Sequence, residues 1–346
     1  MINLKSNNKI TNPIFQNIMF IGDPHVSSKK MSTRHDGLTI LDTIINKLSQ
    51  AAKISHEKKA YTIITGDLLD DDKENNIILL NKLITVLQEF YYPPLTVIGN
   101  HEKTENVINE KNMITALINT GTIQEVQDNK MSVVLNINDD IIYIGGTNYV
   151  SIIPNKITRP KDADYVLWVT HHDLMFENYY PGSQPLKEIS GVDLAINGHI
   201  HDTKPQVQTK MTTWWNTGNI FRQRINMKDH VPSVWLWNPE HHQKSKNKLI
   251  QVPLDYNKDV FINHETIEAT IKPDYDTKNT DTILNNSDKK FQFIELIDNA
   301  VANQENNKTS DKELFKEHMA NLAKLQQIPD DITEELFNML QETELD

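Results

Sequence analysis

Apolar runs alternate with helical patterns along the first hundred residues of the chain. The run at 17–22 is typical of a buried strand, and apolar residues then recur at helical spacing from 38 to 48. The unit repeats, with a strand-like run at 61–65, an apolar-periodic helix at 77–90 and a further strand at 95–98. Strands that alternate with helices in this way predict an α/β fold.

Strands predominate in the middle of the chain. Four more apolar runs suit strands, and they lie at 131–135, 141–144, 165–169 and 193–196. From Met211 onward the helical patterns stop and strand-like segments follow one another, joined by turns. We expect these last segments to form a second sheet.

The polar and apolar pattern divides the chain into three regions. We predict a main domain over 14–255, a small α+β capping domain over 256–302, and a linker with a helix-loop-helix over 303–346. In the C-terminal region, a pair of amphipathic segments flanks Pro329, which breaks the helical pattern. Such a helix pair either docks on its own domain or binds the helices of a partner.

Composition restricts the chemistry more than the fold. A chain of 346 residues can bury one sizeable core with a smaller appended domain. Without cysteine, disulfides and thiolate metal sites are excluded, so histidine, carboxylate and amide oxygen must hold any metal. No signal-like segment opens the sequence, and no apolar run approaches the roughly 20 residues that span a bilayer. We therefore expect a cytoplasmic protein that does not bind membranes.

The charge of the chain bears on its partners. The formal net charge is −12, and the only arginines are Arg34, Arg159, Arg222 and Arg224. This composition is poor for a protein that grips DNA unaided. If the substrate is a nucleic acid, bound metal or a partner must offset the negative charge.

Metal-ligating residue types directly follow five of the predicted strands. Open α/β sheets place ligand sites at these carboxyl ends. Carboxylate, amide oxygen and imidazole together suit a divalent ion such as Mn²⁺. Asp67 is the best candidate for a ligand shared by two ions, because it lies on a loop after a strand and a glycine precedes it. The five segments are Asp23-Pro24-His25, Gly66-Asp67, Gly99-Asn100-His101-Glu102, His171-His172 and Gly198-His199-Ile200-His201.

The order D-x-H, GD, GNH and GHxH resembles the calcineurin-like metallophosphoesterase superfamily. The resemblance implies a β-sandwich flanked by helices, with two divalent metal ions between the motifs. It also implies that His101 is the catalytic acid, beside the metals without ligating either. We choose His171 over His172 as a ligand because it lies nearer the end of its strand. The implied ligands are Asp23, His25, Asp67 and His201 for the first metal, and Asp67, Asn100, His171 and His199 for the second.

The chain shares part of its sequence pattern with protein phosphatases of that superfamily. Glu102 in GNHE and Asp70, the second aspartate of GDxxDRG, both match the phosphatase pattern. However, Asp71 replaces the arginine that grips the substrate phosphate there. A monoester dianion would be held poorly without such a bidentate cation, which counts against a phosphatase.

The rest of the chain resembles SbcD-type nucleases, including their shorter bacteriophage versions. NGHIHDTKPQ followed by WWNTGNIFRQ matches a family segment, and the C-terminal helix-loop-helix matches the family's tail. The resemblance implies a Mn²⁺-dependent DNA exonuclease and endonuclease of repair or recombination, as a homodimer with an SbcC-type coiled-coil ABC ATPase. It places Arg222 and Arg224 near the metals, where they would contact phosphate.

Two positions depart from the SbcD pattern, and two other functions stay open. Such nucleases carry histidine where this chain has Asp70, which we expect to orient His101. Glu102 replaces the usual aspartate, and we expect it to support the ligands from behind. The first alternative is a stand-alone phosphatase or small-molecule phosphodiesterase of the same fold. The second is a non-catalytic binding module that keeps metals for structure.

Overall fold

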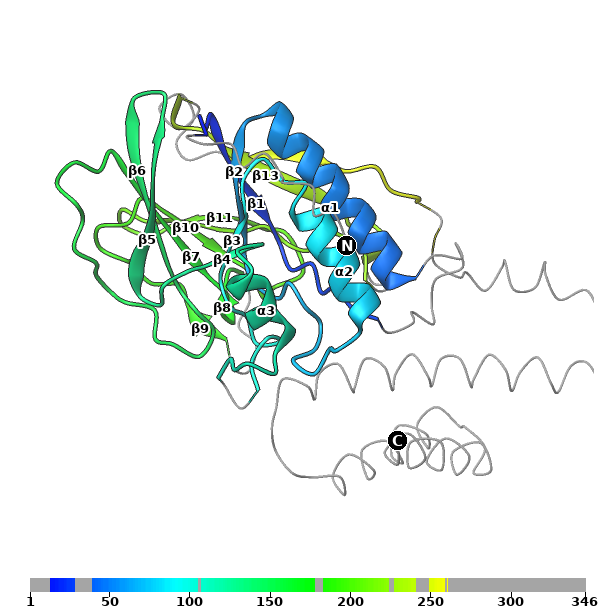
Figure 1. Cartoon of the computed structure of the whole chain (residues 1–346). Coiled ribbons are helices and arrows are strands. Elements are labelled where there is room, and N and C mark those ends of the chain that lie inside the picture. Colours follow the sequence, from blue (N-terminus) through cyan, green and yellow to red (C-terminus); the bar gives the residue numbers. More distant parts are fainter. Residues whose placement is uncertain are drawn as a thin grey trace, which may run out of the picture. The chain divides into compact units, whose positions relative to one another are not determined.

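The computed structural model divides the chain into two compact units, Met1–Ile267 and Glu268–Asp346 (Figure 1). Every residue that the structure describes belongs to the first unit. The predicted capping domain lies outside the described residues except at its start, and the predicted linker and helix-loop-helix lie wholly outside them. The described residues are 13–28, 39–104, 107–177, 183–223, 227–240, 249–258 and 260.

The first of two six-stranded sheets is built around the strand that leads to Asp23. This strand, β1 (Asn17–Ile21), pairs in parallel with β2 and antiparallel with β13. Two short parallel strands continue the sheet beyond β2, so the carboxyl ends of four neighbouring strands lie at one edge. From edge to edge the sheet comprises β14 (Ile250–Pro253), β13 (Ser233–Trp237), β1, β2 (Ala60–Ile64), β3 (Leu95–Thr96) and β4 (Gln124–Glu125).

The second sheet contains four consecutive parallel strands, β12, β10, β7 and β6, between two antiparallel edge strands. A third sheet has only two strands, β8 (Leu174–Met175) and β9 (Gln184–Pro185), which pair in parallel. The order of the second sheet is β11 (Lys204–Gln208), β12 (Thr213–Asn216), β10 (Leu194–Asn197), β7 (Tyr165–Thr170), β6 (Asp140–Thr147) and β5 (Lys130–Ile137).

The sequence had led us to expect that the strands after Met211 form a sheet of their own. They do not. β12 joins the second sheet beside β10, whereas β13 and β14 join the first sheet beside β1. The physical reason is that β1 and β10 are apolar on both faces, so each needs a neighbouring strand on both sides to satisfy its buried backbone groups.

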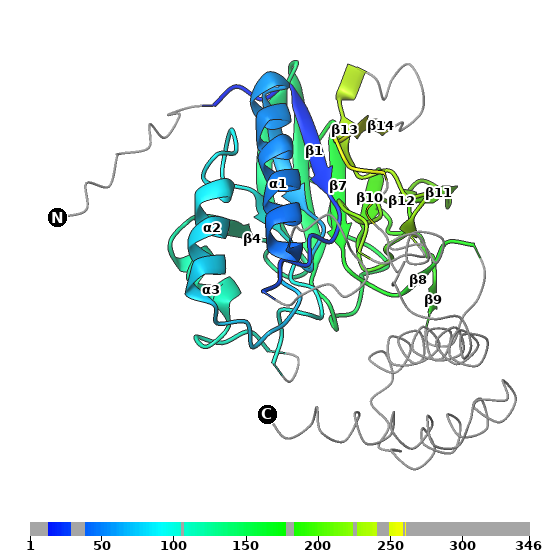
Figure 2. The ribbon, with the colours of Figure 1, turned by 90° about the vertical axis from the view of Figure 1, so that its right-hand side faces the viewer.

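Three helices cover the outer face of the first sheet (Figures 1 and 2). They are α1 (Ile40–Glu57), α2 (Ile77–Leu87) and α3 (Met113–Asn119). Thr39 caps α1 by accepting a hydrogen bond from the Asp42 amide, and Asn76 caps α2 through the amides of Ile78 and Leu79. Among the described helices, none is long and apolar enough to cross a membrane.

Alternate residues of each central strand bury into different cores. In β1, Met19 and Ile21 pack toward the helices, whereas Ile18 and Phe20 pack into the core shared by the two sheets. The outer face of the second sheet carries a third core, in which Leu174, Phe176, Ile189 and Val192 pack around Trp168 and Trp214. These layers confirm the expected α/β sandwich flanked by helices.

Candidate metal centre

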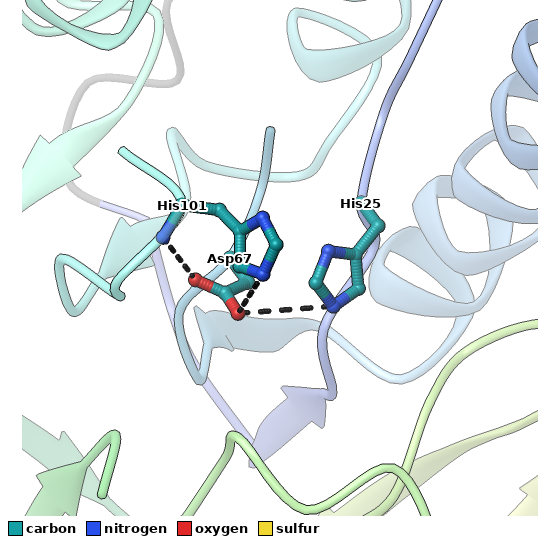
Figure 3. Close-up of side chains that lie close together, drawn as sticks. All are labelled: His25, Asp67 and His101. Carbon is teal, nitrogen blue, oxygen red and sulfur yellow. Dashed lines mark hydrogen bonds and ion pairs between the residues drawn. The ribbon is translucent and has the colours of Figure 1, made fainter. Parts of the chain in front are cut away.

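The Asp67 carboxylate lies among histidines from both predicted ligand sets. It follows β2, is buried, and its Oδ2 is 3.0 Å from His171 Nε2 and 3.7 Å from His25 Nε2. Its Oδ1 accepts a hydrogen bond of 3.1 Å from the His101 amide. Figure 3 shows dashed lines from the Asp67 carboxylate to the rings of both His25 and His101. Asp67 therefore belongs to both of the described groups of residues that could hold a metal ion.

The residues predicted for the first metal converge beside Asp67. His25 Nε2 and His201 Nε2 are 3.0 Å apart, so these nitrogens either share a proton or face a common cation. Asp23 is fully buried, and neither of its carboxylate oxygens has a hydrogen-bond partner. Burial raises the pKa of this carboxyl, although nearby His171 opposes the rise. Asp23 Oδ1 lies 3.6 Å from His171 Nδ1, at ion-pair distance. A buried carboxylate without a hydrogen bond is costly, so this donor set fits a divalent cation.

The residues predicted for the second metal meet on the other side of Asp67. Asn100 Oδ1 lies 3.2 Å from His171 Nε2 and 3.0 Å from His199 Nδ1. His171 Nδ1 lies 2.8 Å from the Thr65 carbonyl, to which it donates, so Nε2 is the ring nitrogen that points toward Asp67 and Asn100. Asp67, His171 and His199 each offer one ligand atom within 4.8 Å of the others.

His172 points away from this centre. Its Nε2 lies 2.8 Å from the Ser151 carbonyl, and burial lowers its pKa to about 4. This neutral, buried imidazole donates to the Ser151 carbonyl and so fixes the loop that carries Ser151. Of the two neighbouring histidines, the structure thus brings His171 to the ligand cluster.

Backbone strain concentrates at the predicted ligands. Asp23, His25, Asp67 and His199 have φ angles of 31°, 45°, 45° and 73°, in the left-handed region that residues with a side chain rarely adopt. Each such residue costs on the order of 1–3 kcal/mol and persists only where its surroundings enforce it. Strain at four residues of one cluster indicates that the loops are shaped for a function.

The motif glycines make room for ligand side chains. A Cβ atom on Gly198 would lie 2.7 Å from Asp23 Oδ1 and 2.8 Å from His171 Nδ1, far inside van der Waals contact. Gly66 has a φ of 107°, and a Cβ there would lie 2.7 Å from His171 Cγ and closer still to Nδ1 of that ring. These glycines therefore belong to the site, since any larger residue would displace a ligand.

His101 faces the cluster from the loop after β3. Its Nδ1 lies 2.7 Å from the Asp70 carbonyl, so Nδ1 carries a proton and Nε2 points toward Asp67, 4.0 Å from Oδ2. Burial alone would lower its pKa, but the Asp67 carboxylate and the Asp70 carbonyl outweigh this and raise it. The ring is 30% exposed, which leaves it open to a substrate. His25, Asp67 and His101 also form a group that could hold an ion, so geometry permits His101 to be a ligand or an acid.

Asp70 and Glu102 both contact the loops that carry His101 and the predicted ligands. The Asp70 carbonyl, and not its carboxylate, orients His101, while the carboxylate Oδ1 lies 3.4 Å from His25 Nδ1. Glu102 is fully buried and accepts hydrogen bonds from the Leu69 amide at 3.1 Å and the Gly99 amide at 2.7 Å. Burial, assisted by the Asp67 charge, raises its pKa to about 7. Glu102 thus ties two ligand-bearing loops together.

Two residues at the centre escaped the sequence reasoning. Asp173 Oδ2 lies 3.1 Å from His199 Nε2, and the Tyr149 ring stacks on the His199 ring with centroids 5.8 Å apart. Asp173 lies two residues after His171, which was a usable signal. Tyr149 follows the end of β6. This strand lies beside β7, which leads to His171, and the sequence alone does not reveal that neighbour.

Arg222 is engaged with the backbone of its own domain. It is 3% exposed, its guanidinium donates to the carbonyls of Asn257, Lys228 and Lys258, and it stacks over the Tyr256 ring at 4.7 Å. This geometry argues against the predicted contact with substrate phosphate. Arg224 lies outside the described residues.

The fold and the clustered ligands define a divalent-metal hydrolase. The chain belongs to the calcineurin-like phosphoesterase family, which matches residues 16–203, more than half of its length. The matched span includes every predicted metal ligand from Asp23 to His201. A search of curated protein sequences finds no significant match.

Several solved structures are similar to this chain at low identity. They include a 5'-nucleotidase precursor from Thermus thermophilus, at 9% identity with a TM-score of 0.37, covering 64% of this chain and 50% of that one. The Haemophilus influenzae NAD nucleotidase is 12% identical with a TM-score of 0.38, and the coverage is 68% and 49%. The Candida albicans 5'-nucleotidase is 14% identical with a TM-score of 0.40, and the coverage is 72% and 54%. The match thus spans about half of each of these proteins.

Proposed function

We propose that the protein is a Mn²⁺-dependent phosphodiesterase that cleaves DNA, of the SbcD nuclease type. The observation that carries the proposal is the meeting of two ligand sets at Asp67, with the buried Asp23 carboxylate, which accepts no hydrogen bond, in the first. Two bound divalent ions would polarise the phosphoryl oxygens and supply a hydroxide nucleophile at neutral pH.

His101 would assist departure of the leaving oxygen. The Asp70 carbonyl holds the proton on Nδ1, so a protonated ring presents the Nε2–H toward the cluster. The raised pKa favours the protonated form, in which an imidazolium can donate to a departing oxygen. Glu102 would keep the His101 loop in register with the Asp67 loop through its two backbone hydrogen bonds.

The arginines favour a phosphodiester over a phosphomonoester. Arg159 Nη1 lies 2.6 Å from Asp193 Oδ2, and Arg222 donates to backbone carbonyls, so both arginines within the described ranges are engaged by the protein. Asp71 stands where phosphatases carry their phosphate-gripping arginine. A diester carries one negative charge per phosphate and needs no bidentate cation of that kind.

DNA and a partner ATPase complete the proposal. The net charge of −12 repels DNA, so we propose that the metal ions and an SbcC-type coiled-coil ATPase offset it. The segment at 303–346 would bind that ATPase within a homodimer in the cytoplasm. The support for the ATPase and the homodimer is the sequence pattern of the segment alone.

Parallel cleavage assays on four substrates test the proposal. The full chain would be incubated with Mn²⁺ and single-stranded DNA, double-stranded DNA, an aryl phosphodiester or an aryl phosphomonoester, with and without a coiled-coil ATPase. We expect cleavage of DNA and the diester, and little turnover of the monoester. Intact DNA in every mixture would overturn the nuclease assignment. Brisk monoester turnover would identify a stand-alone phosphatase instead, and inertness toward all substrates would identify a binding module.

A further inference from the structure

The ligand histidines differ in what holds the ring nitrogen that faces away from the metals. An imidazole binds a metal through one nitrogen, and the partner of the other nitrogen fixes the tautomer and the orientation of the ring. His171 uses a neutral partner, the Thr65 carbonyl at 2.8 Å. His25 and His199 instead face carboxylates, those of Asp70 and Asp173.

His25 directs its Nε2 into the centre. That nitrogen lies 3.0 Å from His201 Nε2 and 3.7 Å from Asp67 Oδ2, so it is the nitrogen that a first metal would meet. The opposite nitrogen, Nδ1, is buried and lies 3.4 Å from Asp70 Oδ1. The pair is at ion-pair distance without hydrogen-bond alignment, and Asp70 is the acidic group on the outer side of the ring.

His199 is oriented the other way round. Its Nδ1 faces the centre, 3.0 Å from Asn100 Oδ1, and its Nε2 lies 3.1 Å from Asp173 Oδ2. The Tyr149 ring stacks on the imidazole at 28°, so the ring is held at its face as well as at its edge. In both histidines the carboxylate thus meets the nitrogen opposite to the one that faces the ligand cluster.

We propose that Asp70 and Asp173 are positioning residues, one for each metal. The Asp70 carboxylate, at ion-pair distance from Nδ1 of His25, favours the proton on that nitrogen through its charge and leaves Nε2 for the first ion. Asp173 holds the proton on Nε2 of His199 and frees Nδ1 for the second. A carboxylate partner also makes an imidazole a more basic ligand than a carbonyl partner does. The two sites can therefore be weakened separately, and the inference rests on the family's metal centre, whatever the substrate.

Metal titration of the full-length, metal-stripped protein tests this assignment. Mn²⁺ binding would be followed by calorimetry in the wild type and in D70N, D70A, D173N and D173A. We expect each Asp→Ala change to weaken one of two binding events by about 10- to 100-fold and to leave the other unchanged. The Asp→Asn changes keep an acceptor but remove the charge, so they should fall between Asp→Ala and the wild type.

A matched control separates positioning from simple loss of charge. Asp72 lies on the same loop as Asp70, and its carboxylate binds the Thr104 hydroxyl. D72N removes the same charge, but we expect it to change Mn²⁺ affinity by about twofold at most, because charges away from the ligands are screened. An equal loss in D72N and D70N would overturn the proposed role of Asp70.

Double-mutant cycles show whether each carboxylate acts through its histidine. D70A should cost no further affinity in a His25→Ala background, yet keep its full cost in a His199→Ala background. The reverse pattern is expected for D173A. Additive losses in every background, or unchanged affinity in D70A and D173A, would refute the proposal.

Imidazole ¹⁵N shifts of the metal-free protein give a second readout. They should show the Nδ1–H form for His25 and the Nε2–H form for His199, with each preference weakened by its Asp→Ala change. Unchanged tautomers in the variants would contradict the proposal. Thermal unfolding would confirm that the variants fold. These measurements use no DNA, so inactivity toward DNA would leave their outcome unaffected and would count against the proposed function alone.

Discussion

Gly198→Ala is the smallest change that should displace ligands of both metals together. The added Cβ would lie 2.7 Å from Asp23 Oδ1 and 2.8 Å from His171 Nδ1, and it would also crowd the Thr65 carbonyl. Asp23 belongs to the first predicted ligand set and His171 to the second. A single methyl group therefore bears on both ions.

The displacement can be worked from these distances. Ordinary contacts of a Cβ begin at 3.4 Å, so Asp23 Oδ1 must move by about 0.7 Å, the difference from 2.7 Å. Metal sites tolerate ligand displacements of only about 0.2 Å. A misplacement near 1 Å in a catalytic site costs about 100-fold in rate. We expect Gly198→Ala to lose at least about 10-fold in Mn²⁺ affinity at both sites and about 100-fold in turnover.

Gly145→Ala is the matched control, because it is as crowded but lies away from the ligands. Its Cβ would meet the Trp168 ring at 2.5 Å and the Lys130 carbonyl at 2.6 Å within the second sheet. Both variants should lose thermal stability, but only Gly198→Ala should lose metal affinity in calorimetric titrations of folded protein. Wild-type affinity in Gly198→Ala, or an equal loss in Gly145→Ala, would refute the reasoning.

Three further predictions concern single side chains. His101→Ala should lower DNA cleavage by about 10²- to 10⁴-fold with Mn²⁺ affinity retained, whereas a large loss of affinity would make His101 a ligand. Arg222→Ala should lower the free energy of unfolding by about 3 kcal/mol in urea titrations without changing Mn²⁺ affinity, because its guanidinium is bound to backbone carbonyls; lost affinity with intact stability would restore a role at the site. Burial lowers the pKa of His172 to about 4, so the stability it contributes is present above its ordinary pKa and is lost as pH falls toward 4. Between pH 7 and pH 5, metal-free His172→Gln should therefore lose about 2 kcal/mol less unfolding free energy than the wild type, and equal losses would contradict the assigned pKa.

The sequence was sufficient to predict the helices and strands whose hydrophobic pattern is local. β1 and β7 are apolar on both faces, and α1 repeats its apolar residues at helical spacing, so each was recognisable without its neighbours. Strand partners were not recognisable, because β13 pairs with β1 from more than 200 residues away. The two-residue strand β4 is too short to carry any pattern.

The candidate site shows the same division between local and non-local information. The family resemblance assigned the ligands of both sets, and the structure brings them together at Asp67. Spacing could not tell that the Asp70 carbonyl would reach His101 while its carboxylate faced His25, because backbone conformation decides that. It also missed Asp173, and it could not tell that the Arg222 guanidinium would be buried against the 256–258 segment.

The strands beyond residue 203 decide when the metal loops can form during synthesis. The family match ends at that residue, yet β10, which leads to His199, has β12 as one neighbour, and β1, which leads to Asp23, has β13. A nascent chain that ends before 233 would expose the apolar edge of β1, a recognised hazard for aggregation. Closing contacts across such a separation is also slow. The first ligand to be synthesised, Asp23, therefore waits for some of the last residues of its domain, and the smallest fragment that can be expected to fold must extend past β14.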